Sequence, residues 1–175
     1  MRRKRIASFR PPHFGISDPY FCRKIQIMED IRTDIPNFEW GSVEQLRTPE
    51  EKTALFFTAR WINELLNKWN TNCAYITMTG NEGALRRRIR NRSTVAKLHT
   101  VTQEKAELSE IIKTIVDLAD SKFIRAFFIF GIADSLDEEQ REWLEEVAKT
   151  TNSYIYVAGV VDPEVYEAEL AALES

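Results

Sequence analysis

Short apolar runs alternate with amphipathic stretches along the second half of the chain. The runs at residues 73–79, 124–132 and 154–161 are continuous and rich in branched or aromatic side chains, as is typical of strands buried on both faces. Between them, residues 100–121 and 135–150 repeat apolar side chains every three or four positions, which is the spacing of one helix face. Trp143 is expected on the inward face of the second of these helices. The second half therefore alternates predicted strands with predicted helices.

Three weaker signals complete this pattern. Residues 81–91 favour a short helix that Asn81 caps, residues 93–99 favour a strand, and Asp162-Pro163 begins a last helix. Alternating strands and helices with long connections predict a parallel sheet with helices on both faces. We expect a three-layer Rossmann-like α/β fold with four or five mostly parallel strands and a core within residues 73–175.

The first half carries fewer structural signals. Thr48-Pro49-Glu50-Glu51 has the residues of a capping box and predicts a helix to about Trp69, on which Trp69 is apolar and faces the core. Residues 23–28 alternate weakly and favour an edge strand, whereas residues 33–41 favour a loop. Residues 1–22 are basic and aromatic with a Pro-Pro pair, which predicts an N-terminal arm before a single α/β domain at 23–175.

Composition excludes several classes of protein. The 43% apolar and 29% charged content is typical of a folded domain, and no apolar stretch is long enough to span a membrane. The basic start is not followed by the apolar segment of a signal peptide, so we expect a cytoplasmic protein. Cys22 and Cys73 stand alone, which argues against structural zinc and favours a buried, inert Cys73 thiol.

Charge is distributed unevenly although the net charge is only −3. Residues 1–99 contain 18 Lys and Arg against 10 Asp and Glu, whereas residues 100–175 contain 6 against 17. Such asymmetry favours a polyanionic partner for the basic half, or basic-to-acidic contact between subunits. The alternative is that the two halves neutralise each other within one fold.

The densest basic segment contains five arginines within residues 86–92. The guanidinium group binds phosphate in a bidentate geometry and stays charged at physiological pH, so such a cluster favours the phosphates of DNA or RNA. The arm adds cations among aromatic side chains that could stack on unpaired bases. The expected contact residues are Arg2, Arg3, Lys4, Arg5, Arg10, Arg86, Arg87, Arg88, Arg90 and Arg92. Two alternatives are a solvated basic helix that pairs with the chain's own acidic second half, such as residues 138–146, and contact with a protein partner.

The ends of the predicted strands are the second candidate location for chemistry. Open parallel sheets bind ligands beyond the carboxyl ends of their strands. This rule selects Gly80, Asn81, His99, Asp134, Ser135 and Asp162 as a candidate ligand pocket. The segment TGNEGALRRR matches neither dinucleotide nor P-loop fingerprint, and the two aspartates are explained more simply as helix caps than as Mg²⁺ ligands.

These observations predict a non-catalytic α/β protein that binds nucleic acid through phosphates and needs no cofactor. One alternative is an enzyme on the same fold, with Mg²⁺, that handles a nucleotide or phosphate ester at the strand ends. The other is an assembly protein whose N-terminal arm joins the subunits of a homo-oligomer.

Overall fold

A computed structural model describes residues 39–89, 91–104, 107–132 and 136–174 of the 175-residue chain. They belong to one unit, Glu39–Ser175. The expected arm and the expected strand at 23–28 lie outside the described residues, as do the individual positions Arg90, Asp134 and Ser135.

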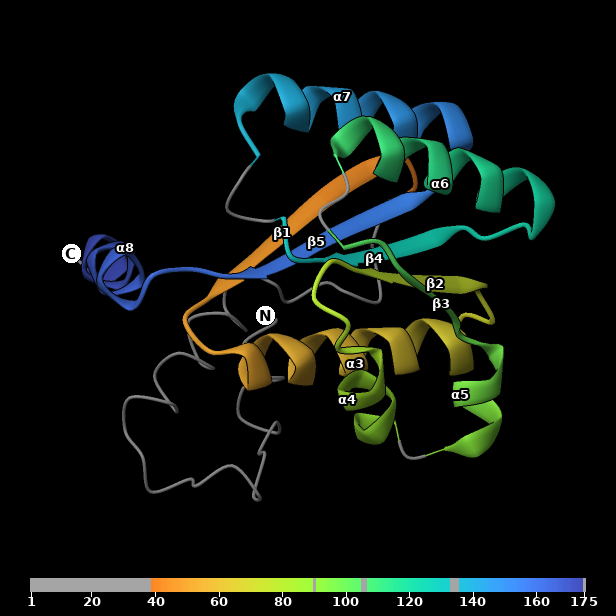
Figure 1. The fold of residues 1–175 in the computed structure, drawn as a ribbon, viewed down its shortest axis with the longest axis horizontal. Helices are drawn as coiled ribbons and strands as arrows, with labels where there is room; N and C mark the ends of the chain where they lie inside the picture. Colours follow the sequence, from red (N-terminus) through yellow and green to blue (C-terminus); the bar gives the residue numbers. More distant parts are fainter. Residues whose placement is uncertain (1–38, 90, 105–106, 133–135, 175) are drawn as a thin grey trace. The chain divides into compact units, whose positions relative to one another are not determined.

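A five-stranded sheet with the order β1-β5-β4-β2-β3 forms the centre of this unit, and every neighbouring pair is parallel (Figure 1). The predicted α/β architecture is therefore confirmed. The order reverses between β2 and β4, because the chain continues from β2 toward one edge and from β4 toward the other. The strands are β1 (Ser42–Thr48), β2 (Cys73–Thr77), β3 (His99–Thr102), β4 (Ala126–Phe130) and β5 (Tyr154–Val160).

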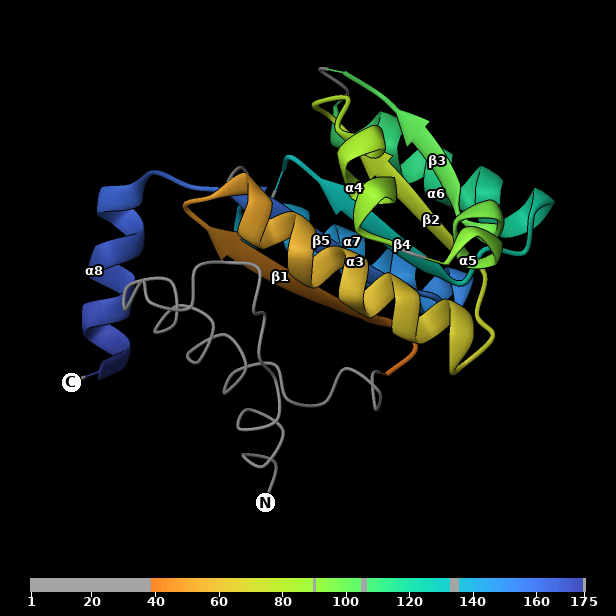
Figure 2. The ribbon, with the colours of Figure 1, turned by 90° about the horizontal axis from the view of Figure 1, so that it is seen from below.

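Helices cover both faces of the sheet. Figures 1 and 2 show α3, α4 and α5 on one face and α6 and α7 on the other, while α8 follows β5 beyond the carboxyl edge. The helices are α3 (Glu51–Asn67), α4 (Glu82–Arg88), α5 (Arg92–Lys97), α6 (Leu108–Ser121), α7 (Glu138–Thr151) and α8 (Pro163–Glu174). None of the helices that the structure describes is long and apolar enough to cross a bilayer.

The two sides of the sheet have different cores. Aliphatic side chains such as Ile76 and Ile129 pack beneath α6 and α7. Aromatic side chains dominate beneath α3, where the Trp61 and Tyr156 rings meet edge to face at 4.9 Å and Phe128 lies against Tyr156. Every residue of β2 and β4 is buried, so these central strands are the continuous apolar runs of the sequence.

The expected beginning of α3 is wrong. Thr48 is the buried last residue of β1, a strand that the sequence pattern did not reveal, and Glu50 occupies the N-cap position without a side-chain capping bond. Only three of the seven β1 residues are buried, because β1 is an edge strand with one partner, β5. Its apolar signal is therefore too weak to predict a strand.

The expected strand at 93–99 is also wrong, since α5 occupies most of it. The Asn91 side chain accepts hydrogen bonds from the backbone N–H groups of Ser93 and Thr94, at 2.9 and 3.3 Å, and so caps this short helix. The strand β3 begins only at His99.

Two tryptophans expected on inward helix faces are exposed instead. Trp69, just after α3, and Trp143, on α7, are each 45% exposed. The apolar spacing therefore predicted the helices α3 and α7, but on each it assigned one exposed tryptophan to the buried face.

Candidate functional site

The carboxyl end of β2 carries a network of polar side chains centred on Asn81. Its Oδ1 accepts hydrogen bonds from the Tyr75 and Thr77 hydroxyls, each at 2.7 Å, and its Nδ2 donates to the Glu51 carboxylate at 2.9 Å. Asn81 holds the N-cap position of α4, but its side chain makes no capping bond because these partners already engage it. The network ties the strand end to the first turn of α3.

Carboxylates surround the turn at Gly80. A Cβ at Gly80 would lie 3.9 Å from Glu104 Oε2, and Glu82 Oε2 accepts from the Thr102 hydroxyl at 3.1 Å. Burial raises the pKa of the Tyr75 phenol, and the nearby Glu51 and Glu82 carboxylates raise it further. The described side chains nearest to Gly80 and Asn81 are therefore carboxylates and hydroxyls.

Met78 and Gly131 lie in close contact just past the ends of β2 and β4, where the strand order reverses. The Met78 N–H donates to the Phe130 carbonyl at 2.9 Å, which continues the pairing one residue past β2. A Cβ built on Gly131 would lie only 2.8 Å from Met78 Cβ, so the two residues are in close contact. Met78 therefore occupies the space directly beside Gly131 at the position that doubly wound sheets commonly use for ligands.

The other strand-end candidates are dispersed or lie outside the described residues. His99 is the first residue of β3 and pairs with Ala74, so it lies at the amino edge, opposite the Asn81 network. Asp162 Oδ1 accepts from the Glu164 N–H at 2.8 Å, which makes it a helix cap as expected. Asp134 and Ser135 are not described. Among the described residues, no group of three His, Cys, Asp or Glu side chains forms a metal site.

The arginine run divides between two short helices on the α3 face of the sheet. Leu85 and Ile89 are buried and anchor the run, while Arg87 and Arg92 are exposed. Arg86 and Arg88 are half-buried; Arg86 Nη2 donates to the Thr100 hydroxyl at 2.9 Å, and Arg88 Nη1 donates to the Ala84 carbonyl at 3.1 Å. We define the basic face as Arg86, Arg87, Arg88, Arg92 and Lys97.

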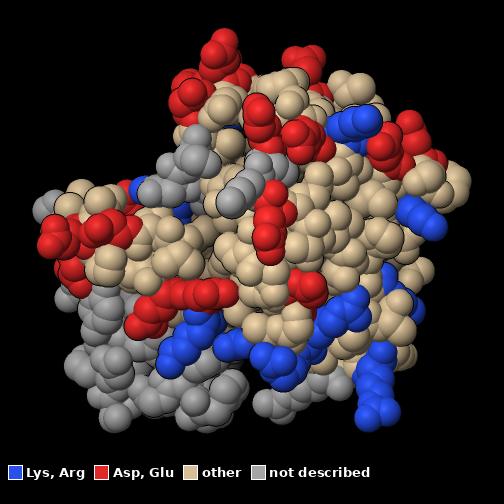
Figure 3. All heavy atoms as spheres, viewed as in Figure 1, with Lys and Arg blue, Asp and Glu red and all other residues tan. Residues whose placement is uncertain are grey.

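The sheet separates the basic face from the acidic helices. Figure 3 shows most Lys and Arg over the lower part of the view, where Figure 1 has α3 to α5, and many Asp and Glu over the upper part, where α6 and α7 lie. The four described arginines of the basic face form no salt bridge with another described residue. Because α4 and α7 cover opposite faces, residues 138–146 form no ion pair with the described arginines of the run.

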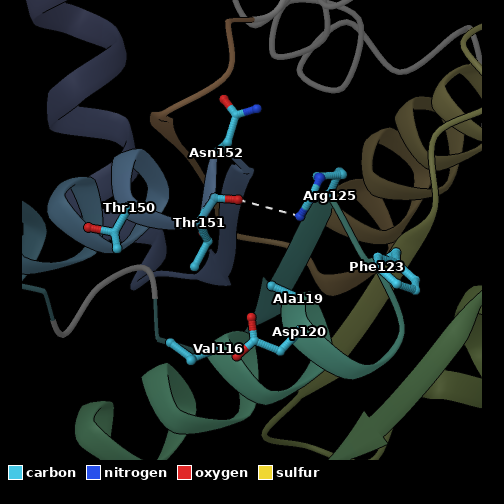
Figure 4. Close-up of a pocket in the computed structure, with 8 residues that line it drawn as sticks. All are labelled: Val116, Ala119, Asp120, Phe123, Arg125, Thr150, Thr151 and Asn152. Atoms are coloured by element: carbon cyan, nitrogen blue, oxygen red, sulfur yellow. Dashed lines mark hydrogen bonds between the residues drawn. The ribbon is translucent and has the colours of Figure 1, made fainter.

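A second feature, which the sequence analysis missed, lies at the amino edge of the sheet. A hollow of about 550 Å³ opens between the carboxyl-terminal ends of α6 and α7 (Figure 4). It is lined by Val116, Ala119, Asp120, Phe123, Arg125, Thr150, Thr151 and Asn152. The sequence pattern assigned Arg125 to the beginning of the strand expected at 124–132 and gave Phe123, just before it, no role.

No protein-family model matches this chain, and no curated protein matches it significantly.

Proposed function

We propose that this protein binds nucleic acid through its phosphates, with the basic face on α4 and α5 as the contact surface. The observation that carries the proposal is the separation of this face from the acidic helices by the full thickness of the sheet. Arginines without intramolecular counter-ions repel one another, and a row of phosphates relieves that repulsion while it releases condensed counter-ions.

Geometry also favours phosphate contacts over the reading of bases. The helix α4 has seven residues and α5 has six, and they are separated by a capped turn at Asn91. Neither is a long continuous helix of the kind that enters a major groove. Short helices that present guanidinium groups suit the backbone of DNA or RNA, and we therefore expect binding with little sequence preference.

The acidic side of the molecule supports a single orientation on the polyanion. The helix α7 contains five glutamates against one arginine and one lysine, and α8 contains four glutamates and no cation. A nucleic acid is attracted to the basic face and repelled by these glutamates, which favours one orientation of docking.

The strand-end alternative receives less support. A nucleotide-handling site needs room and positive potential at the switch point, whereas Met78 lies against Gly131 there and the Glu104 carboxylate lies beside Gly80. For this reason we propose a binding function rather than catalysis on a nucleotide.

Binding to labelled DNA and RNA at several salt concentrations tests the proposal. Replacing Arg87 and Arg92 by Gln should weaken binding and lower the slope of log K against log salt by about 1.4–1.8, because each lost phosphate contact removes about 0.7–0.9. The matched control replaces Lys113 and Arg141, two cations on α6 and α7, by Gln. Equal behaviour of the two variants would overturn the proposal, because it would show that net charge alone matters.

A further inference from the structure

The hollow at the amino edge combines an aromatic ring, a cation and an exposed amide. Figure 4 shows Arg125 between Phe123 on one side and Thr151 and Asn152 on the other, with Asp120 on α6 facing them from below. The residues come from three elements that the sheet holds in place, the ends of α6 and α7 and the approach to β4. The hollow is open, so a ligand can enter without displacing any described segment.

Phe123 is the most unusual residue of this hollow. Its φ of +56° is left-handed, at the position after a helix end where glycine or asparagine is favoured. The Ile124 N–H donates to the Leu118 carbonyl and the Asn72 amide donates to the Phe123 carbonyl, and these bonds hold the backbone in that conformation. The side chain is 66% exposed. A bulky aromatic residue is therefore kept in a strained conformation that leaves its ring open to solvent.

Arg125 provides the positive charge. It is half-buried, and its Nη1 reaches the Thr151 carbonyl only at 3.5 Å, the outer limit of a hydrogen bond. Most of its donors therefore remain available to an anion. Asn152, also left-handed with a φ of +50°, carries an exposed amide, and the Asp120 carboxylate offers acceptors.

Residues between the end of α3 and β2 form hydrogen bonds both with α5, which carries part of the basic face, and with Arg125 of the hollow. The Thr94 hydroxyl on α5 donates to Asn67 Oδ1 at the end of α3 at 2.8 Å, and the Arg125 N–H donates to the Asn72 carbonyl at 3.1 Å. In this parallel arrangement the connecting helices run against the strands, so α3, α5, α6 and α7 end at the amino edge. Exposed lysines lie at or beside these ends, at Lys68, Lys97, Lys122 and Lys149.

From this arrangement we infer that the hollow binds an unpaired nucleotide of a single strand. Its base stacks on the Phe123 ring, its phosphate contacts the Arg125 guanidinium, and Asn152 and Asp120 supply hydrogen-bonding groups for the base edge. This inference rests on the proposed function and adds a preference to it. A base stacked within a duplex cannot reach a single exposed ring, whereas an unpaired base can.

Replacing Phe123 by Gly tests the inference because it separates binding from folding. Glycine adopts the left-handed conformation without strain, so the melting temperature should stay the same or rise. Loss of one stacked base should weaken binding to a labelled single-stranded 15-mer by about 5- to 150-fold, the equivalent of about 1–3 kcal/mol. Binding to a duplex of the same length should not change, and Phe123→Trp should retain single-strand binding.

The outcomes distinguish this inference from the proposed function. If Phe123→Gly binds the single strand as tightly as the wild type while the Arg87→Gln, Arg92→Gln variant loses affinity, the hollow is not a base site although the basic face is a binding surface. If the full-length wild-type protein binds neither nucleic acid at low salt, both are wrong. Equal losses on single strand and duplex would also reject the stacked base.

Discussion

The Asn81 amide donates to the Glu51 carboxylate at 2.9 Å, although 30 positions separate the two residues in the chain. This bond joins the turn after β2 to the first turn of α3. The same Asn81 accepts from the Tyr75 and Thr77 hydroxyls, so one side chain connects a central strand, a turn and a helix. The polar side chains around Asn81 at the carboxyl edge therefore stabilise the packing of β2 against α3.

Replacing Asn81 by Ala should destabilise the protein by about 1–3 kcal/mol. The Tyr75 and Thr77 hydroxyls would lose their shared acceptor, and an unsatisfied buried hydroxyl carries most of its desolvation cost. Urea denaturation measures the loss. As a control, Asn63→Ala removes an acceptor on the exposed face of α3 and should change stability by less than about 0.5 kcal/mol. Similar effects at the two sites would show that the Asn81 network contributes little.

Gly131→Ala should be among the most destabilising substitutions at the carboxyl edge. The φ of +120° at Gly131 is strained for any residue with a Cβ, and the added atom would lie 2.8 Å from Met78 Cβ. We expect a loss of at least about 1–3 kcal/mol. The double variant Gly131→Ala, Met78→Ala should recover part of it, because the steric contact is then removed. If Gly131→Ala leaves the free energy of unfolding unchanged, Met78 does not pack against Gly131 as closely as this contact requires.

Asp162→Ala should cost about 0.5–2 kcal/mol, because its carboxylate accepts from the Glu164 N–H at the beginning of α8. Asp162→Ser should restore most of this stability, since serine also caps helices. Thermal melting of the three proteins provides the comparison. A serine variant no better than alanine would contradict the capping role.

Alkaline pH should destabilise the protein through Tyr75. Burial raises the pKa of its phenol in the folded state, whereas the unfolded chain ionises near pH 10. The unfolded state then binds fewer protons than the folded state, so the free energy of unfolding falls as the pH rises above about 10. Denaturation at pH 9, 10 and 11 measures this fall, and Tyr75→Phe should make it shallower. If Tyr75→Phe loses as much free energy of unfolding between pH 9 and 11 as the wild type, groups other than Tyr75 cause the alkaline destabilisation.

Burial should also protect the Cys73 thiol from reagents. It raises the pKa of this thiol, which is fully buried at the beginning of β2. In a Cys22→Ser variant, labelling by a thiol reagent should therefore follow unfolding of the sheet and accelerate with urea as unfolding does. Rapid labelling under native conditions would contradict this.

Strands and helices with strong apolar patterns were predictable from the sequence. The buried runs of β2, β4 and β5 and the helix α7 were placed within a few residues, because their patterns are imposed by burial itself. The helix expected from residue 100 begins only at Leu108, because His99–Thr102 forms β3. The edge strand β1 was missed because its stability comes from pairing with β5, which a local pattern cannot reveal. Similarly, α5 depends on the two capping bonds of Asn91, which outweighed the strand preference of its residues.

The candidate sites were predictable only in part. The arginine run was visible as composition, but its separation from the acidic helix α7 depends on which face each helix covers, and that follows from topology. His99 was assigned to the wrong edge because the end of one predicted strand was in fact the beginning of β3. The hollow beside Phe123 could not be predicted, because a left-handed φ at a phenylalanine runs against local preference.

The pairing of β1 with β5 has a consequence for the order in which the chain folds. The Tyr154 hydroxyl donates to Glu44 across 110 positions, and the first described strand finds its neighbour only in the last one. During synthesis the amino-terminal strand leaves the ribosome well before β5 exists. Its backbone edge stays unpaired, and the Val43 and Leu46 side chains stay unburied, until β5 has been synthesised. Pairing of β1 with β5 is therefore a late step with a high entropic cost of loop closure. A truncated chain that ends before Tyr154 would leave both β1 and β4 without their shared partner.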